Sequence, residues 1–205
     1  MKNEIDTSTE EKIKNAARIV FFQKGFAATR TRDIAEEAGI NLALLNYYFR
    51  SKSKLFEIIM LETLSGFIQT ISIILNNEKT SLDDKVSQIA TTYIDFIIKD
   101  PEIPIFILTE IRNNPTMLVK KLPISKVVLN SFFFKQHQMA VNEGKISEPN
   151  PLHFLMNLMG LVVFPFMAKP MILAGNGLAD DGFIALMQER KKMIPIWIKA
   201  MMTAK

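Results

Sequence analysis

Apolar residues recur at helical spacing along nearly the whole chain of 205 residues, and no stretch shows the strict alternation of a half-buried strand. Short segments rich in asparagine, proline or glycine separate the apolar runs, for example NNEKT at 76–80 and PEIP at 101–104. Such segments end helices. The pattern therefore predicts an all-α fold of about nine helices.

Three of these helices fall within the first fifty residues. Ser8 and Glu11 have the spacing of a capping box, and the apolar stripe behind them should end at Gly25. The next helical segment is short. Thr31 is the expected cap of this second helix, and Gly39 closes it.

A third helix should begin directly after the glycine turn. Asn41 is its expected cap, the helix runs through Phe49, and Ser51 is placed to cap a fourth. Two short helices joined by a tight turn and packed on a longer one form a helix-turn-helix unit. We therefore expect residues 1–53 to form one domain and residues 54–205 to form a second, larger helical domain.

The second domain should contain long apolar helices. The spacing predicts them at 52–76, 82–99, 103–113, 116–143, 152–174 and 181–203. Pro123, Pro165, Pro170 and Pro195 lie inside these ranges. Because proline lacks an N–H and its ring clashes with the preceding turn, each should kink or split its helix.

Composition excludes several classes of protein. Hydrophobic residues make up 48% of the chain and charged residues 22%, so a packed core is expected and disorder is not. The absence of cysteine excludes disulfides, thiolate catalysis and sulfur-ligated metal, and suits the cytoplasm. The N-terminus lacks the apolar run of a secretory signal, and the apolar stretch 154–168 is too short to span a bilayer. The net charge of +4 permits nucleic-acid binding.

Positive charge gathers at the beginnings of two predicted helices. Lys52 and Lys54 occupy the first turn of the fourth helix, directly after Arg50, and Arg32 occupies the first turn of the second. A cation there opposes the helix dipole by about 0.3–1 kcal/mol. Solvated lysine on an ordinary surface is one explanation. The other, which we favour, is that these helix ends face phosphate, which would satisfy the free N–H groups and the cations together.

The short third helix has one face suited to a core and one suited to DNA. Leu45 and Phe49 should face inward, against Ile34 and Ala35 of the second helix. The solvent face carries Asn41, Leu42, Ala43 and Asn46. A small residue permits close approach, an apolar one can touch a thymine methyl, and an asparagine amide fits adenine. The hydroxyls of Tyr47 and Tyr48 can donate to phosphate.

The run TRTRDIAEEAGINLALLNYYFRSKSKLF carries a family resemblance. It resembles the N-terminal DNA-binding domain of TetR-family (tetracycline-repressor-like) transcriptional regulators, over residues 10–60. The resemblance implies phosphate contacts from Thr31, Tyr47, Tyr48 and Lys52, and base readout by Arg32, Leu42, Ala43 and Asn46. Many members carry tyrosine where this chain has Asn46 and serine where it has Asn41, which favours a base contact at Asn46.

The larger domain is rich in methionine and phenylalanine, most of which core packing alone explains. A few polar residues interrupt the apolar helices and could anchor a ligand. Candidate pocket residues for a small hydrophobic effector are Tyr93, Phe106, Phe133, His137, Phe154 and Asn157. The resemblance further implies a homodimer joined through the last two helices, with candidate interface residues Phe164, Phe166, Phe183, Met187, Ile194 and Trp197.

These features together predict a regulator that binds double-stranded DNA, with no cofactor, no metal site and no membrane partner. The favoured hypothesis is a dimeric repressor released from a near-palindromic operator by a largely apolar effector. The alternative is a constitutive regulator or activator whose larger domain only dimerises. We do not expect an enzyme, because the sequence shows no nucleophile–base pair and no phosphate-cradling glycine loop.

Overall fold

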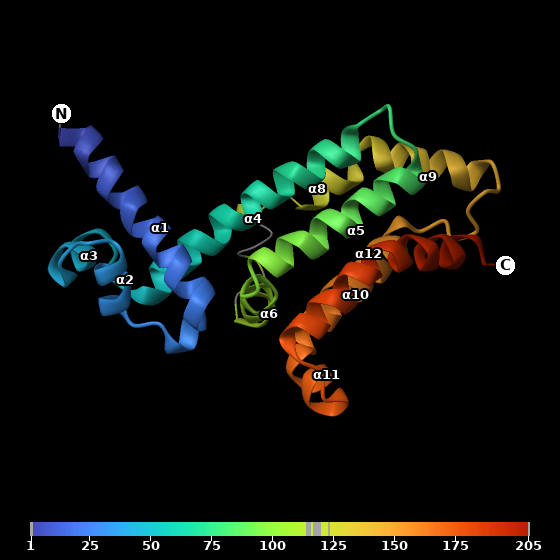
Figure 1. The fold of residues 1–205 in the computed structure, drawn as a ribbon. Coiled ribbons are helices and arrows are strands. Elements are labelled where there is room, and N and C mark those ends of the chain that lie inside the picture. The colour runs from blue at the N-terminus through green and yellow to red at the C-terminus, as the bar shows by residue number, and fades with distance from the viewer. Residues whose placement is uncertain (1, 114–115, 117–119, 123, 205) are drawn as a thin grey trace. The chain divides into compact units, whose positions relative to one another are not determined.

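The computed structural model describes residues 2–113, 116, 120–122 and 124–204, and in these it contains eleven helices and no strand (Figure 1). The predicted all-α fold is confirmed. The chain forms two compact units, Met1–Ser65 and Gly66–Lys205. The division falls inside the long fourth helix, whereas the sequence placed the domain boundary at residues 53/54, where that helix begins.

The N-terminal unit is built from the first four helices. They are α1 (Lys2–Ala28), α2 (Thr31–Glu37), α3 (Leu42–Tyr48) and the first part of α4 (Lys52–Asn76). Gly25 interrupts α1 with φ 72° and ψ 165°, so the expected stop at this glycine is confirmed. Ser8 lies inside α1, and the expected helix start there is wrong.

Side-chain caps define the two short helices. The Asn41 side chain accepts a hydrogen bond from the Leu44 N–H at 2.8 Å, and Ser51 accepts one from the Lys54 N–H at 3.1 Å, so both predicted caps are confirmed. Thr31 is not the cap of α2. That position belongs to Arg30, whose N–H donates to the carboxylate of Asp33 at 3.0 Å.

The turn between α2 and α3 depends on a glycine. Gly39 has φ 60°, in the left-handed region that other residues avoid. In this conformation the Ile40 N–H reaches the carbonyl of Ala35 at 3.0 Å, which closes α2. The chain then enters α3 within two residues, as a helix-turn-helix requires.

The C-terminal unit contains the remaining helices. They are α5 (Leu82–Lys99), α6 (Ile103–Asn113), α8 (Ile124–Leu129), α9 (Phe132–Asn142), α10 (Pro151–Met167), α11 (Lys169–Asn176) and α12 (Asp180–Thr203). Two predicted helices are split. Ser131 caps a new helix by accepting from the Phe134 N–H, and the chain turns at Ala168, before Pro170 in the first turn of α11. Pro123 lies outside the described residues.

Three helices surround the core of this unit. α5, α10 and α12 pack on one another, and they bury Ile94, Leu158 and Ile198 almost completely (Figure 1). Two ion pairs join α5 to α12 outside this core, Asp83–Lys199 and Asp95–Lys191. The unit is therefore an apolar helical body with charges along its margin.

Pro165 lies inside α10 without ending it. Because proline has no N–H, the carbonyl of Leu161, four residues earlier, loses its helical partner. The guanidinium of Arg190, on α12, donates to that carbonyl at 2.7 Å and also lies over the Trp197 ring at 5.0 Å. The carbonyl that the proline leaves free thus becomes a polar link between α10 and α12.

This link can be tested with a double-mutant cycle. Arg190→Met should lower the free energy of unfolding by about 1.5–3 kcal/mol, because it removes a charged donor from a carbonyl with no helical partner. In a Pro165→Ala background the helix supplies its own N–H, so the same change should cost substantially less. Urea denaturation of the four variants measures both costs. Equal costs in the two backgrounds would show that the Leu161 carbonyl does not depend on Arg190.

Candidate nucleic-acid interface

Helix α3 has one face that is buried in the N-terminal unit and one that is largely exposed to solvent. Leu45 and Phe49 are 1% and 4% exposed, Ile34 and Ala35 of α2 are buried as well, and α2 and α3 pack on each other. Both inward assignments made from the sequence are confirmed. The outward residues Asn41, Ala43 and Asn46 are exposed, and Leu42 is half-buried. The outer face can therefore meet a ligand without disturbing the core.

The two tyrosines at the end of α3 differ in exposure. Tyr47 is 76% exposed and Tyr48 is half-buried, and their rings meet edge to face with centroids 5.4 Å apart. A ring that is so exposed needs support, and its neighbour supplies it. Both side chains lie at the C-terminal end of α3, close in sequence to the cations that begin α4.

The start of α2 is electrostatically mixed. Arg32 is exposed and Thr31 is partly exposed, as a DNA contact requires. The next residue is Asp33, which accepts from the Arg30 N–H and pairs with Lys24 at 3.1 Å. These interactions, with the Arg30 bond first, hold the pKa of Asp33 below its usual value. The first turn of α2 therefore already contains one negative charge, that of Asp33.

Lys52 has a role that the sequence did not reveal. Its ammonium donates to the carbonyls of Phe26 and Thr29, each at 2.8 Å, and lies 4.4 Å from the centre of the Phe26 ring. These carbonyls follow the interruption of α1 at Gly25. Lys52 thus joins the start of α4 to the α1–α2 connection, and only its remaining donor is free for phosphate. Because Lys52 and Thr29 are 23 residues apart, no local sequence pattern indicates this contact.

Lys54 fits the role of a phosphate contact more simply. It is exposed, and its ammonium pairs with Glu57, one turn along the same helix, at 2.9 Å. An exposed pair of this kind contributes little to stability. The ammonium can therefore leave its partner for a stronger anion at small cost.

The predicted effector residues lie mostly inside the C-terminal core. Phe106, Phe133, His137 and Phe154 are buried, and the rings of Phe133 and Phe154 are 4.9 Å apart. Tyr93 is half-buried with its ring edge-on to Phe67, and burial raises the pKa of its hydroxyl to about 12. It therefore stays protonated. Burial lowers the pKa of His137, so this imidazole is neutral at pH 7.

A hollow of ≈ 180 Å³ lies between the start of α10 and the end of α12. It is lined by Glu148, His153, Phe154, Met156, Asn157, Ile198, Met201 and Met202. Only Phe154 and Asn157 belong to the predicted pocket, so the structure does not bring the six predicted residues together around this hollow. Glu148 accepts hydrogen bonds from the Asn150 N–H and His153, and the His153 bond is the main cause of its lowered pKa.

Three of the residues predicted to form the dimer interface lie instead in the core of the C-terminal unit. Phe183, Met187 and Ile194 are at most 1% exposed within the single chain, because this stripe of α12 packs on α5 and α10. Phe164 is 59% exposed, and Phe166 and Trp197 are half-buried. Both stripes of α12 are apolar, so the sequence alone could not tell the inward from the outward one.

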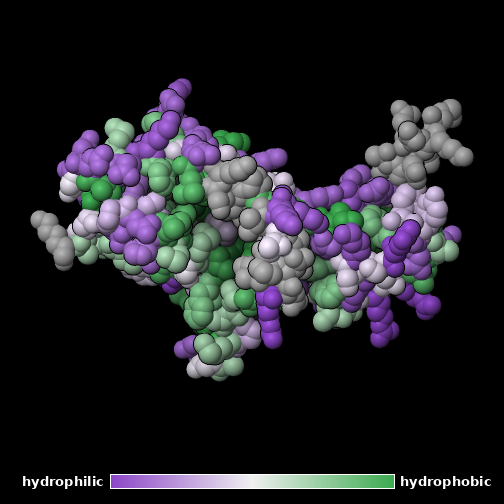
Figure 2. Space-filling model, turned by 180° about the vertical axis from the view of Figure 1, so that it is seen from behind, coloured by the Kyte–Doolittle hydropathy of each residue, from purple (hydrophilic) through white to green (hydrophobic). Residues whose placement is uncertain are grey.

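An apolar surface remains on the C-terminal unit. Its exposed members on α10, α11 and α12 are Leu152, Met156, Phe164, Met171, Leu186, Met193, Ile196 and Met201. Figure 2 shows hydrophobic side chains gathered around α11 and on the surface beside it. We call these eight residues the outer apolar face. Exposed apolar side chains in this number are typical of an interaction site.

The N-terminal unit decides the family. Residues 13–59 match the family model described as bacterial regulatory proteins, tetR family. The chain is a TetR-family transcriptional regulator. It therefore binds DNA through its helix-turn-helix, and it belongs to a family of regulators, not of enzymes. Among the described residues, no three His, Asp or Glu side chains are grouped to hold a metal ion.

One relative matches along most of the chain. The Probable HTH-type transcriptional regulator YttP of Bacillus subtilis (strain 168) is 27% identical over 166 residues, which is 78% of each chain. The similarity therefore extends past the helix-turn-helix into the C-terminal unit.

Solved structures share the fold of the whole TetR-family chain. The regulator FadR from Bacillus subtilis, in complex with stearoyl-CoA, has a TM-score of 0.60 at 19% identity and covers 90% of this chain and 96% of its own. A TetR/AcrR-family regulator from Thermobifida fusca YX-ER1 has a TM-score of 0.65 at 14% identity, covering 91% and 96%. At these identities the likeness concerns the fold.

Among the described residues, one helix and one bent pair of helices are apolar enough to cross a membrane by length and composition alone. They are α4, and α10 taken together with α11 across a 62° bend. Core helices of soluble proteins pass the same test. In this structure they are helices of the two compact units, and α4 carries the charged Glu62 near the middle of its length.

The two lysines at the start of α4 should respond differently to removal. Lys52→Ala deprives two carbonyls of a charged donor, so it should lower thermal stability and weaken binding to specific and random DNA alike. Lys54→Ala should leave stability unchanged and make the slope of log affinity against log salt shallower by about 0.9. Thermal unfolding and fluorescence anisotropy at several salt concentrations measure these effects. Equal thermal shifts for the two variants would contradict the role given to Lys52.

Proposed function

We propose that this TetR-family regulator is a dimeric repressor that leaves a near-palindromic operator when a small, largely apolar effector binds. The observation that carries the proposal is the outer face of α3, where Asn41, Ala43 and Asn46 are exposed while the inner residues Leu45 and Phe49 are buried. A two-fold dimer presents two such helices to successive major grooves of one face of the duplex. Residues 1–53 read DNA, and residues 54–205 bind the effector and dimerise.

The contacts on DNA divide into two kinds. Phosphate is held by Thr31, Tyr47, Tyr48, Lys54 and the remaining donor of Lys52, and bases are read by Arg32, Leu42, Ala43 and Asn46. The exposure of Arg32, Ala43 and Asn46 supports their assignment. The carbonyl of the Asn41 side chain caps α3, so its amide group is the part left for DNA.

The outer apolar face is the surface proposed to join two copies. It lies on α10, α11 and α12, the helices that pack together near the C-terminus. A two-fold axis pairs such a face with itself, which is the commonest way for a soluble chain to bury it. Of the interface residues predicted from the sequence, Phe164 belongs to this face, and Phe166 and Trp197 are half-buried.

An apolar effector suits the lining of the C-terminal unit. Isoleucine, leucine, valine and phenylalanine fill most of the buried positions, and Phe154 with three methionines lines the hollow beside α12. FadR of similar fold was solved with stearoyl-CoA bound. The hollow of ≈ 180 Å³ is smaller than the roughly 300–1,000 Å³ of ordinary ligand pockets. The effector therefore has to displace flexible methionine side chains, and its binding favours a conformation with lower DNA affinity.

The proposal is tested by selecting fragments of the source genome that bind the purified protein. Anisotropy then compares the recovered duplex with a shuffled one, and addition of fatty acyl compounds should release the duplex and raise the thermal stability of the protein. Recovery of no sequence above the shuffled control would overturn the proposal. Sequence-specific binding with no release and no thermal shift would favour the constitutive alternative.

Asn46 should determine one base pair in each half-site. Asn46→Ala should reduce discrimination at that position by about 1–3 kcal/mol, because a bidentate amide contact to the base is lost, while random DNA is bound as before. Anisotropy with a set of single-base operator variants measures this. Loss of affinity for random DNA to the same extent would show that Asn46 contacts the backbone instead.

The outer apolar face should hold the dimer together. Met193→Glu places a charge on this face and should convert the dimer to a monomer, because the charge cannot be buried without a partner. Ile73→Glu, at a residue 74% exposed on α4, is the matched control and should leave the dimer intact. Light scattering after size-exclusion chromatography measures the mass. A dimer that survives Met193→Glu would place the interface elsewhere.

A further inference from the structure

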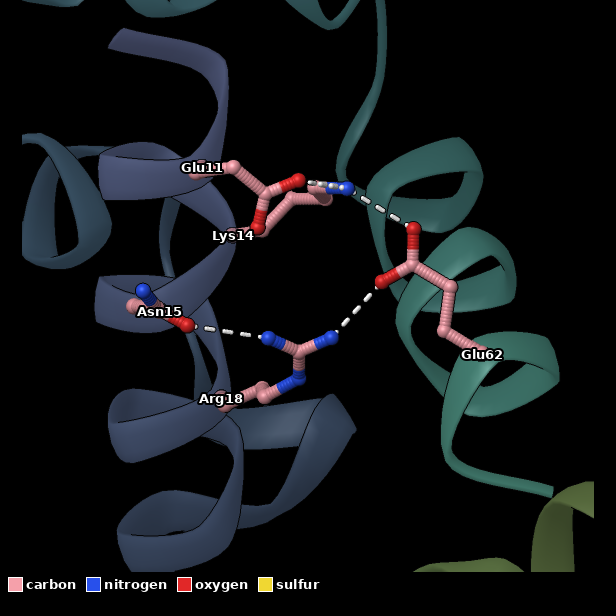
Figure 3. Close-up of polar contacts among 5 residues, drawn as sticks. All are labelled: Glu11, Lys14, Asn15, Arg18 and Glu62. Carbon is pink, nitrogen blue, oxygen red and sulfur yellow. Dashed lines mark hydrogen bonds and ion pairs between the residues drawn. The ribbon is translucent and has the colours of Figure 1, made fainter. Parts of the chain in front are cut away.

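One carboxylate joins α1 to α4 within the N-terminal unit (Figure 3). Glu62 of α4 accepts from Lys14 at 2.8 Å through one oxygen and from Arg18 at 2.6 Å through the other. Lys14 also pairs with Glu11 at 2.5 Å, and Arg18 donates to Asn15 at 2.9 Å. Four of these five residues belong to α1, so Glu62 is the member that connects the network to α4.

This network is stronger than an ordinary surface pair. Lys14 is 6% exposed, so its charge depends on its two carboxylate partners. Burial lowers the pKa of Lys14, the hydrogen bonds to Glu11 and Glu62 raise it, and the net direction is upward. Because one carboxylate bridges two cations on successive turns of α1, both the spacing and the rotation of α4 against α1 are fixed.

Glu62 also occupies a particular place along α4. It lies one turn before the division between the two units at Ser65 and Gly66. Phe67 is the second residue of the C-terminal unit, and its ring stacks on that of Phe96 with centroids 4.0 Å apart. The helix is continuous through all of these residues. α4 is thus held by charge on one side of the division and by aromatic packing on the other.

We propose that Glu62 is the positioning residue that fixes the DNA-reading helices to α4, so that the two heads of a dimer are held at one spacing. The inference rests on the proposed dimeric operator complex. With Glu62 in place, α1 and the first turns of α4 move as one body, and an operator of wrong spacing is bound poorly. Without it, Lys52 and the packing of Phe56 on Phe21 and Phe26 still join α1 to α4, but the charged bridge no longer restricts their rotation. Each head can then adjust to its half-site, and discrimination between spacings falls.

The test compares Glu62→Gln with Glu11→Gln. Both variants remove one negative charge that pairs with Lys14, but only the first removes the charged bridge from α1 to α4. Each protein is titrated by anisotropy against the selected operator, against operators with one base pair inserted or deleted at the centre, and against a duplex carrying a single half-site. Thermal unfolding accompanies the titrations.

Wild type and Glu11→Gln should prefer the native spacing over the altered ones by about tenfold or more, within the usual range of coupling between two sites. Glu62→Gln should lose most of that preference and bind the single half-site as wild type does, because the buried anchor of α3 is untouched.

Three results would contradict the positioning role of Glu62 or the dimeric function on which it rests. Spacing selectivity in Glu62→Gln equal to that of Glu11→Gln would overturn the positioning role. Equal loss of affinity for the operator and the half-site would also overturn it, since Glu62 would then only stabilise the unit. Absence of any spacing preference in the wild type would overturn the proposed dimeric function, and this inference with it.

Discussion

The burial of Leu45 and Phe49 is the constraint on which the DNA-reading surface depends. A helix of seven residues is not stable alone in water, so α3 exists only because its inner face is packed against α2. That packing requires the tight turn at Gly39 and leaves the outer face without any structural task. The residues on the outer face can therefore differ between regulators while the helix stays in place.

At two places a cation satisfies backbone carbonyls that the chain leaves without a helical partner. Lys52 serves two carbonyls after α1 is interrupted at Gly25, and Arg190 serves the carbonyl that Pro165 leaves free in α10. In each case the chain departs from a regular helix, and a residue far away in sequence supplies the missing donor. Such contacts fix how elements meet, which apolar packing alone leaves less defined.

The sequence predicted local features and missed those that depend on distant partners. The helices at 52–76, 82–99 and 103–113 and the caps at Asn41 and Ser51 follow from spacing and side-chain chemistry, and the structure confirms them.

The breaks at Ser131 and Ala168 were missed because the apolar pattern continues across them. Phe183, Met187 and Ile194 were misplaced because two apolar stripes run along α12. The partners of Lys52 and Glu62 have no sequence signal, since they lie in other helices.

The most direct test of the central claim is a hydroxyl-radical footprint of the protein on its selected genomic operator. The account predicts two protected patches on one face of the duplex, related by the symmetry of the sequence and separated by a whole number of helical turns of about 10–10.5 base pairs. A single protected patch, or two patches on opposite faces, would contradict a dimer that presents two copies of α3 to successive major grooves.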